Sequence, residues 1–170
     1  HASDTHVSDE GLHRTERLGD LVVALKPDLV LVTGDLVANA PGVDEDRARH
    51  DFELFLKEIG GFPAAVLTVP GNRDTFGVER HNSLVSPEHP LFGKKMYRHY
   101  LGPTYYSFDW GGVHFIALDS VVYHELWYYG HVDETQLAWL EKDLENVEKS
   151  TPVVVFSHSP IQKIYKGWNF

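Results

Sequence analysis

The sequence contains no cysteine, and this absence already limits its chemistry. Disulfides and thiolate metal sites are excluded, so any metal ion must be held by His, Asp, Asn or Glu side chains. No apolar run approaches the ~20 residues that a membrane-spanning helix requires, so we expect no membrane span. The opening residues show no charged segment followed by an apolar stretch, and they favour neither a cytoplasmic nor an exported location.

Basic residues are also few, because 15 Lys and Arg stand against 25 Asp and Glu and give a formal charge of −10 with His neutral. A protein that grips nucleic acid needs a basic face, so we expect no nucleic-acid partner. An anionic ligand could bind only where this negative field is cancelled locally, and bound metal ions are the usual means. The sequence leaves the oligomeric state open.

The chain has 170 residues, enough for one domain with its own hydrophobic core, and we treat 1–170 as a single domain. Continuous apolar runs predict buried strands over 28–33, 64–69 and 152–156. Apolar residues at helical spacing predict one helix before the strand at 28–33 and a second helix between the strands at 28–33 and 64–69. The buried face of the first consists of Leu18, Leu21, Val22 and Leu25, and that of the second of Phe52, Phe55, Leu56 and Ile59. This alternation predicts an α/β fold with a partly parallel sheet.

The second half of the chain has a different pattern. Residues 71–103 are rich in Pro, Gly, His and Asn and are interpreted as a long loop, and a hairpin is predicted over 104–118. A helix is predicted to begin at a capping box of Asp133 and Gln136. Its predicted buried stripe consists of Leu137, Leu140, Leu144 and Val147.

Four polar clusters lie at the ends of predicted strands or of a strand remnant: Asp4-Thr5-His6, Gly34-Asp35, Gly71-Asn72-Arg73-Asp74 and Ser157-His158-Ser159-Pro160. Ligands of α/β sheets gather beyond the carboxyl ends of the strands, so we expect these clusters to converge on one rim. Their Asp, His and Asn side chains suit Mn, Fe or Zn. Two metal ions bridged by a carboxylate can acidify a water and stabilise an in-line displacement at phosphorus.

In this order, D-x-H, GD, GN-x-D and a lone His at a strand end resemble the signature of the calcineurin-like metallophosphoesterases, over nearly the whole chain. The stretch TYYSFDWGGVHFIALDS, followed by QLAWLEKDL, is similar to the branch with class III cyclic nucleotide phosphodiesterases and purple-acid-phosphatase-like hydrolases. The resemblance implies a four-layer sandwich of two mixed β-sheets flanked by helices. It also implies two divalent or trivalent metal ions, drawn from Mn, Fe and Zn.

Carried over residue by residue, the resemblance implies that Asp4 and His6 ligate the first metal ion and that Asp35 bridges both ions. Asn72 and His158 would ligate the second ion. The implied reaction is hydrolysis of phosphomono- or phosphodiesters by attack of a metal-bridging hydroxide. The substrate would be small and phosphorylated: a nucleotide, a cyclic nucleotide, a sugar phosphate or a lipid-linked diphosphate.

Arg73 departs from the family pattern, because the family usually has a His there that contacts phosphate or protonates the leaving oxygen. Arginine cannot act as a general acid near neutral pH, but it can clamp phosphate with two hydrogen bonds. The sequence GNRD also occurs in the branch of UDP-diacylglucosamine pyrophosphatases. Asp74, which would orient that His, is expected to hold Arg73 or a loop amide instead. Arg73 and Asp74 are the candidate catalytic residues.

The resemblance further implies that the domain is incomplete at both ends. Only the tail of the family's first strand precedes Asp4, and the closing strands with a G-H-x-H motif would lie beyond Phe170. Two His ligands would then be missing. We therefore expect weak metal binding, or one metal ion instead of two, and poor turnover.

Other interpretations remain open. Asp4 and His6 could instead form a surface turn, and Asp35 could be a helix cap. Asn72 could be a turn residue and His158 a structural His. The whole chain could also be a non-catalytic or metal-poor binding or scaffolding domain on the same fold. A nucleotide-binding protein is disfavoured, because Walker-type and G-x-G-x-x-G loops are absent from the sequence. His114 is expected to pack or hydrogen-bond in the sheet. An aromatic loop around Tyr123 and Trp127–Tyr129 could pack down or line a substrate pocket, and Lys94, Lys95 and Arg98 are expected on a solvated face.

Overall fold

The computed structural model describes residues 1–81 and 83–161. Its helices and strands follow in the order α1 (Leu12–Leu25), β1 (Leu29–Thr33), α2 (Glu45–Gly60), β2 (Ala65–Val69), α3 (Lys94–Leu101), β3 (Tyr106–Trp110), β4 (Val113–Leu118), β5 (Val121–His124), β6 (Trp127–Gly130), α4 (Glu134–Glu145) and β7 (Val153–Ser157). Two 3₁₀ turns, η1 (Ala40–Gly42) and η2 (Asn72–Asp74), follow β1 and β2. The predicted α/β alternation is confirmed.

The strands form three groups. Strands β1 and β2 are parallel, with Leu29 opposite Ala65 and Thr33 opposite Val69. The second sheet has the order β3-β4-β7, in which β3 is antiparallel and β7 parallel to β4. Over the residues that the structure describes, β5 and β6 pair only with each other. The second sheet is therefore mixed as expected, whereas the first is wholly parallel over the described residues.

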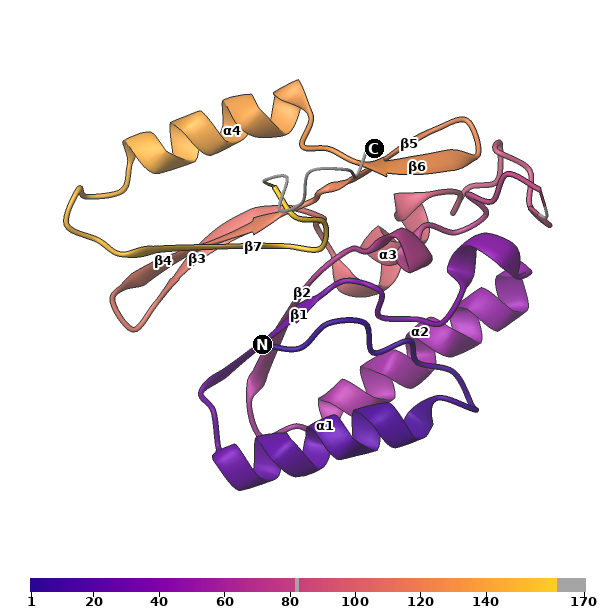
Figure 1. Cartoon of the computed structure of the whole chain (residues 1–170), viewed down its shortest axis with the longest axis horizontal. Coiled ribbons are helices and arrows are strands. Elements are labelled where there is room, and N and C mark those ends of the chain that lie inside the picture. The colour runs from indigo at the N-terminus through magenta and orange to yellow at the C-terminus, as the bar shows by residue number, and fades with distance from the viewer. Residues whose placement is uncertain (82, 162–170) are drawn as a thin grey trace, which may run out of the picture.

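The elements stack as helix, sheet, sheet and helix, with α1 and α2 below the first sheet and α4 above the second (Figure 1). Phe52 and Phe55 of α2 are fully buried in the core between the helices and β1-β2. A smaller cluster of Val69, Ala117 and Phe156 joins the two sheets. The four-layer sandwich expected from the family is confirmed.

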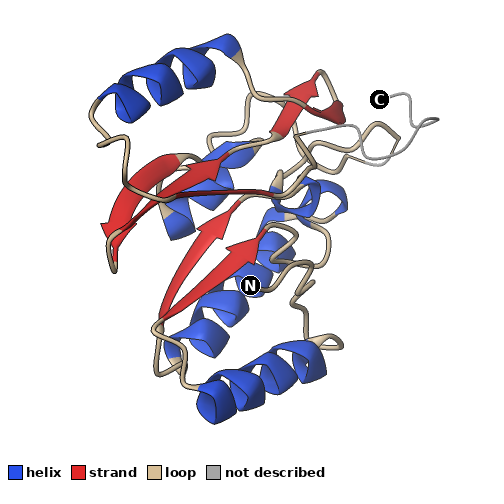
Figure 2. Cartoon of the chain, turned by 60° about the vertical axis from the view of Figure 1, so that its left-hand side comes forward, coloured by secondary structure: helices blue, strands red, loops and turns tan. Residues whose placement is uncertain are grey.

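The first seven residues run beside β1 and extend the parallel sheet. Ala2 pairs with Val32 and Val7 pairs with Val37, both in the parallel sense. The carboxyl ends of β1 and β2 point in the same direction, and the loops that follow them lie on one side of the molecule (Figure 2). This arrangement brings the N-terminal cluster and the first two loop clusters to one edge.

The sequence interpretation of two segments as loops is wrong for part of the first and for the second. Residues 71–103 contain helix α3, which buries Met96 and Tyr97 between two glycines of positive φ, Gly93 and Gly102. A helix of eight residues has too few turns to produce a clear apolar period among Pro and Gly. The aromatic loop is the β5–β6 hairpin, whose run of aromatic residues hides the alternation expected of a strand.

Two of the three predicted helix stripes, those of α1 and α4, are partly wrong, whereas the stripe of α2 is buried or partly buried. Leu21 and Leu25 of α1 are exposed, as are Leu137 and Leu144 of α4. The buried residue of α4 is Gln136. Its Oε1 accepts from the backbone N–H of residue 119 at 2.8 Å, and its Nε2 donates to the backbone carbonyl oxygen of the same residue at 2.9 Å. These two bonds turn the Gln136 face of α4 inward. The predicted cap at Asp133 forms in part, because Asp133 Oδ1 accepts from the backbone N–H of Gln136 at 2.8 Å while the Gln136 side chain bonds residue 119.

Two further expectations concern the segment after β7 and membrane spans. The connection expected between β7 and Phe170 lies outside the described residues. Within the described ranges, none of the helices combines the length and the apolar character needed to cross a membrane.

Candidate metal centre

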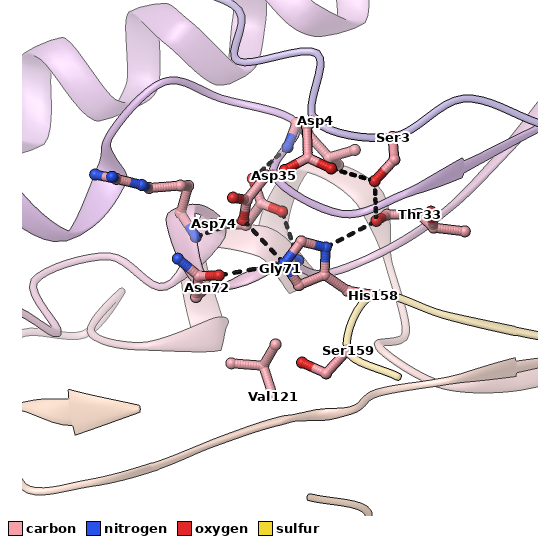
Figure 3. A network of polar contacts seen from close by, with 12 residues as sticks. Ser3, Asp4, Thr33, Asp35, Gly71, Asn72, Asp74, Val121, His158 and Ser159 are labelled. Atoms are coloured by element: carbon pink, nitrogen blue, oxygen red, sulfur yellow. Dashed lines mark hydrogen bonds and ion pairs between the residues drawn. The ribbon is translucent and has the colours of Figure 1, made fainter. Parts of the chain in front are cut away.

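Three strands and the N-terminal segment position the candidate ligands. Asp35 follows β1, Asn72 follows β2, and His158 follows β7 of the other sheet. Asp4 and His6 are held against the chain after β1, because their backbone amides donate to the carbonyl oxygens of residues 34 and 35 at 3.0 and 2.9 Å. Figure 3 shows four of the five predicted ligands, Asp4, Asp35, Asn72 and His158, at one edge, and His6 joins them through its contacts with Asp4 and Asp35.

Asp35 lies at the middle of this group. Its Oδ2 is 3.7 Å from Nε2 of His6, and its Oδ1 is 3.5 Å from Nε2 of His158. Asp4 Oδ1 is 3.5 Å from the same nitrogen of His6. Ligand atoms of Asp4, His6 and Asp35 all lie within 4.8 Å of one another, a spacing that could hold a metal ion. Asp35 therefore belongs to two neighbouring sets of ligand atoms.

The second set contains Asn72 and His158. Nδ1 of His158 lies 2.9 Å from the backbone oxygen of Thr33, which can only accept, so Nδ1 carries the proton. The lone pair of Nε2 then faces Oδ1 of Asn72 at 3.2 Å and Oδ1 of Asp35. Metal-ligating His residues typically donate their other ring N–H to a carbonyl or carboxylate in this way.

Three of the candidate ligands have a left-handed backbone. The φ angles of Asp4, His6 and Asp35 are 56°, 46° and 51°. Non-glycine residues seldom adopt this conformation, and such strain gathers at functional sites where the surrounding structure enforces it. The hydrogen bonds between residues 4–7 and 34–36 provide that enforcement.

Glycines allow the loops after β1 and β2 to touch. A Cβ on Gly71 would lie 2.2 Å from both the backbone nitrogen and Oδ1 of Asp35. A Cβ on Gly34, which has a φ of +80°, would lie 2.7 Å from Nδ1 of His158. The close approach of Asp35 and His158 therefore depends on two positions without side chains.

Asp74 is fully buried and fixes these loops together. Its Oδ1 accepts from the amides of Leu36 and Val37 at 2.9 and 3.1 Å, and its Oδ2 accepts from the amide of Gly71 at 2.7 Å. Burial raises the pKa of Asp74 from 3.8 to about 8, against the lowering effect of the Gly71 amide. Of the two partners expected for Asp74, the structure shows the loop amides and not the Arg73 side chain.

Arg73 is exposed at the rim of the site. Its backbone amide donates to Oδ1 of Asp35 at 2.8 Å, and its Nη1 donates to Oδ1 of Asn39 at 2.9 Å. Asn39 stands in no motif that would select it from the sequence. Its position just before η1, close in space to η2, could be recognised only from the fold.

A buried ion pair lies behind the rim. Lys94 donates to both carboxylate oxygens of Asp119 at 2.7 Å and also to the carbonyl oxygen of Val121. The expectation of a solvated basic face is therefore wrong for Lys94, although Lys95 and Arg98 are exposed. The cause is the fold, which places the first turn of α3 against the chain between β4 and β5.

The donor set fits a pair of cations. It consists of carboxylate and amide oxygens and imidazole nitrogens, the ligands that Mn, Fe and Zn accept. The second set, of Asp35, Asn72 and His158, presents hydrogen-bond acceptors to one another, and such a group is stabilised by a cation among them. In the first set, His6 faces two carboxylates. These observations support the assignment of ligands, which stays a prediction.

Comparisons with known proteins identify relatives of this chain. Human acid phosphatase type 7 is 31% identical over 141 residues, which are 79% of this chain and 29% of that protein. A probable glycerophosphodiester phosphodiesterase of Arcobacter nitrofigilis is 27% identical over 95% of this chain and 56% of its own. A 3′,5′-cyclic adenosine monophosphate phosphodiesterase of Escherichia coli is 24% identical over 94% of this chain and 54% of its own.

The chain thus spans between 29% and 56% of the length of these curated relatives. Among solved structures, a dimetal phosphatase from Danio rerio matches 95% of this chain and 69% of its own, with a TM-score of 0.66 and 17% identity. That likeness shows the fold. The family model of the calcineurin-like phosphoesterases matches residues 1–170, and the chain belongs to that family.

Proposed function

We propose that this chain carries the core of a metal-dependent phosphoesterase that hydrolyses small phosphomono- or phosphodiesters at a site for two metal ions. The observation that carries the proposal is the position of Asp35. One of its oxygens faces His6 and the other faces His158. A carboxylate placed between two sets of ligand atoms is what a bridged pair of metal ions requires.

The proposed ligands divide into two sets that share Asp35. Asp4 and His6 complete the first set, and Asn72 and His158 complete the second. Mn, Fe and Zn suit these oxygen and nitrogen donors. When bound, two such ions would neutralise the charge of a phosphate group and supply an acidified water.

The chain's own residues would then orient the substrate. Arg73 reaches the rim with an exposed guanidinium, which can bind two phosphate oxygens at once. In hydrolysis the water oxygen bonds to phosphorus and the ester P–O bond breaks. The leaving oxygen takes its proton from solvent, because the Arg73 guanidinium does not give up a proton near neutral pH. Asp74 would act as a positioning residue through the loop amides that it holds.

The names of the relatives support a phosphate ester in general. They include an acid phosphatase, a probable glycerophosphodiester phosphodiesterase and a cyclic AMP phosphodiesterase. Phosphomonoesters and phosphodiesters are therefore both candidate substrates.

A non-catalytic domain on the same fold is the second candidate. The observation that favours it is Arg73, which stands at the position of the family's usual His and is held by Asn39. Such a domain would bind metal ions and phosphate without turnover.

The experiment is a paired measurement of metal content and hydrolysis. The chain is incubated with Mn, Fe or Zn, freed of unbound ion and analysed by mass spectrometry. Hydrolysis of p-nitrophenyl phosphate and bis(p-nitrophenyl) phosphate is then followed. We expect about one to two equivalents of metal and metal-dependent hydrolysis. Both should be lost in Asp35→Asn and kept in Asp20→Asn, which changes an exposed carboxylate of α1.

The outcomes separate the two candidates. Metal binding without hydrolysis of either ester would favour the non-catalytic domain. Metal content that is unchanged by Asp35→Asn would contradict both, because both place the ions on Asp35.

A further inference from the structure

A small hollow opens beside the candidate metal centre. It has a volume of about 110 Å³ and lies between the loop after β2 and the β5–β6 hairpin. Its lining includes Asn72 and Arg73 from the loop after β2, Trp127 and Tyr128 from the hairpin, and Arg80. Asn72 lines this hollow and its Oδ1 also lies 3.2 Å from Nε2 of His158, so the hollow borders the predicted ligands.

The outer wall of the hollow is aromatic and exposed. The side chains of Trp127 and Tyr128 are 55% and 37% exposed, and their rings stack with centroids 5.7 Å apart and planes inclined by 14°. The guanidinium carbon of Arg80 lies 5.9 Å from the centroid of the Trp127 ring, within reach of a cation–π interaction. Exposed aromatic rings that border a site commonly mark a binding surface.

The charge of the hollow differs from that of the molecule. Two arginines, Arg73 and Arg80, and one acid, Glu79, are among its lining residues. The chain as a whole carries a formal charge of −10. A local excess of guanidinium groups beside aromatic rings suits a ligand that combines an anionic group with a planar ring.

The base of the hairpin is firmly held, which limits how far its aromatic wall can move. Lys94 bonds the carbonyl oxygen of Val121, the first residue of β5, and pairs with Asp119 just before it. Tyr123 packs edge-on against Phe92, with ring centroids 6.1 Å apart. A wall fixed in advance loses little conformational freedom when a ligand binds.

From these observations we propose that the hollow binds a planar aromatic group of the phosphate ester, so that the preferred substrates are nucleoside or aryl phosphate esters. The ring packs against Trp127 and Tyr128 while the phosphate reaches Arg73 and the ligands around Asp35. This assignment rests on the proposed function, since it places the phosphate at that site. It adds Trp127, Tyr128 and Arg80 as residues that select the substrate.

The test compares ligands that differ only in the ring. AMP and ribose 5-phosphate carry the same 5′-phosphate on the same sugar, and only AMP has a base. Dissociation constants are measured by calorimetry on the Mn-loaded chain. We expect AMP to bind roughly tenfold more tightly, because its base can stack on the aromatic side chains. Phenyl phosphate, measured in the same way, distinguishes a general aryl pocket from one that needs the nucleoside.

A matched pair of variants assigns the preference to the hairpin. Trp127→Ala should bring the affinity ratio of AMP to ribose 5-phosphate close to one. Trp110→Ala, which removes a similarly exposed indole at the end of β3, should leave the ratio unchanged. A ratio near one in the unaltered chain, or a ratio that survives Trp127→Ala, would overturn the proposal.

A further arm keeps this proposal separate from the proposed function. Binding of adenosine, which lacks phosphate, is measured on Asp35→Asn and on Asp35→Asn combined with Trp127→Ala. Adenosine binding that requires Trp127 supports the aromatic pocket even if hydrolysis is absent. Hydrolysis that requires Asp35, without a preference for ring-bearing ligands, overturns the pocket alone.

Discussion

Oδ1 of Asp35 lies 3.5 Å from Nε2 of His158, although the two residues stand near opposite ends of the chain and follow strands of different sheets. The two sheets pack against each other through the cluster of Val69, Ala117 and Phe156. The candidate site therefore depends on correct packing between the sheets as well as on the local loops.

The division of ligands around Asp35 predicts unequal effects of two substitutions. His158→Gln should weaken one metal ion and spare the other, because His158 contacts only the Oδ1 side of Asp35. Asp35→Asn should weaken both ions, since it removes the shared charge. Titration with Mn, followed by calorimetry, measures the number of sites. Equal losses in both variants would contradict a bridging position for Asp35.

Arg73 should contribute to phosphate affinity. Removal of a charged hydrogen-bond donor costs about 1.5–3 kcal/mol, so Arg73→Ala should weaken binding of inorganic phosphate to the Mn-loaded chain about tenfold or more. Arg73→Lys should restore only part of the affinity, because an ammonium group cannot bind two oxygens in a fork. Arg17→Ala on α1 is the exposed control. Phosphate affinity that is unaffected by Arg73→Ala would show that the guanidinium serves Asn39 alone.

Gly71 should tolerate no side chain. A Cβ there would lie 2.2 Å from the backbone nitrogen of Asp35, so Gly71→Ala should reduce the free energy of unfolding by about 1–3 kcal/mol and weaken metal binding. Gly60 has open space around its Cβ position at the end of α2, and Gly60→Ala should be neutral or slightly stabilising. Urea unfolding of both variants measures the difference. Similar stabilities would show that the two loops can move apart without cost.

The sequence was sufficient to predict which residues gather at the candidate site, but not which of their atoms contact one another. Asp35, Asn72 and His158 directly follow apolar strands, and this local pattern was enough to place them at one edge. Which ligand atoms face one another could not be predicted, because the distances depend on the packing of two sheets. The glycines and the left-handed residues Asp4 and His6 carry a signal only when the backbone is known.

Features that depend on tertiary contacts were missed for a physical reason. The inward face of α4 is set by the bond between Gln136 and the backbone of Asp119, which outweighs the apolar spacing of the helix. The hairpin of β5 and β6 has aromatic residues on both strands. Its sequence therefore lacks the alternation of apolar and polar residues by which a strand is recognised. Lys94 finds its partner Asp119 only after the chain has folded.

His114 connects the second sheet to α4 and should make this connection sensitive to pH. Its Nε2 lies 2.9 Å from Asp143 of α4, and its Nδ1 lies 2.8 Å from Asp109 of β3. Asp143 also accepts from Ser107. The hydrogen bond to Asp143, followed by that to Asp109, raises the pKa of His114 above 6.5. The positive imidazolium is thus favoured in the folded state.

A raised folded-state pKa gives the sign of the effect. The stabilisation by His114 is fully present below pH 6.5 and is lost as the pH rises through the folded-state pKa. His114→Gln removes the titrating group, so the advantage of the unaltered chain over this variant in urea unfolding should be largest near pH 6 and shrink toward pH 9. His13→Gln, at an exposed position of α1, should show no such trend. An advantage that grows with pH would mean that His114 is neutral when it joins the sheet to the helix.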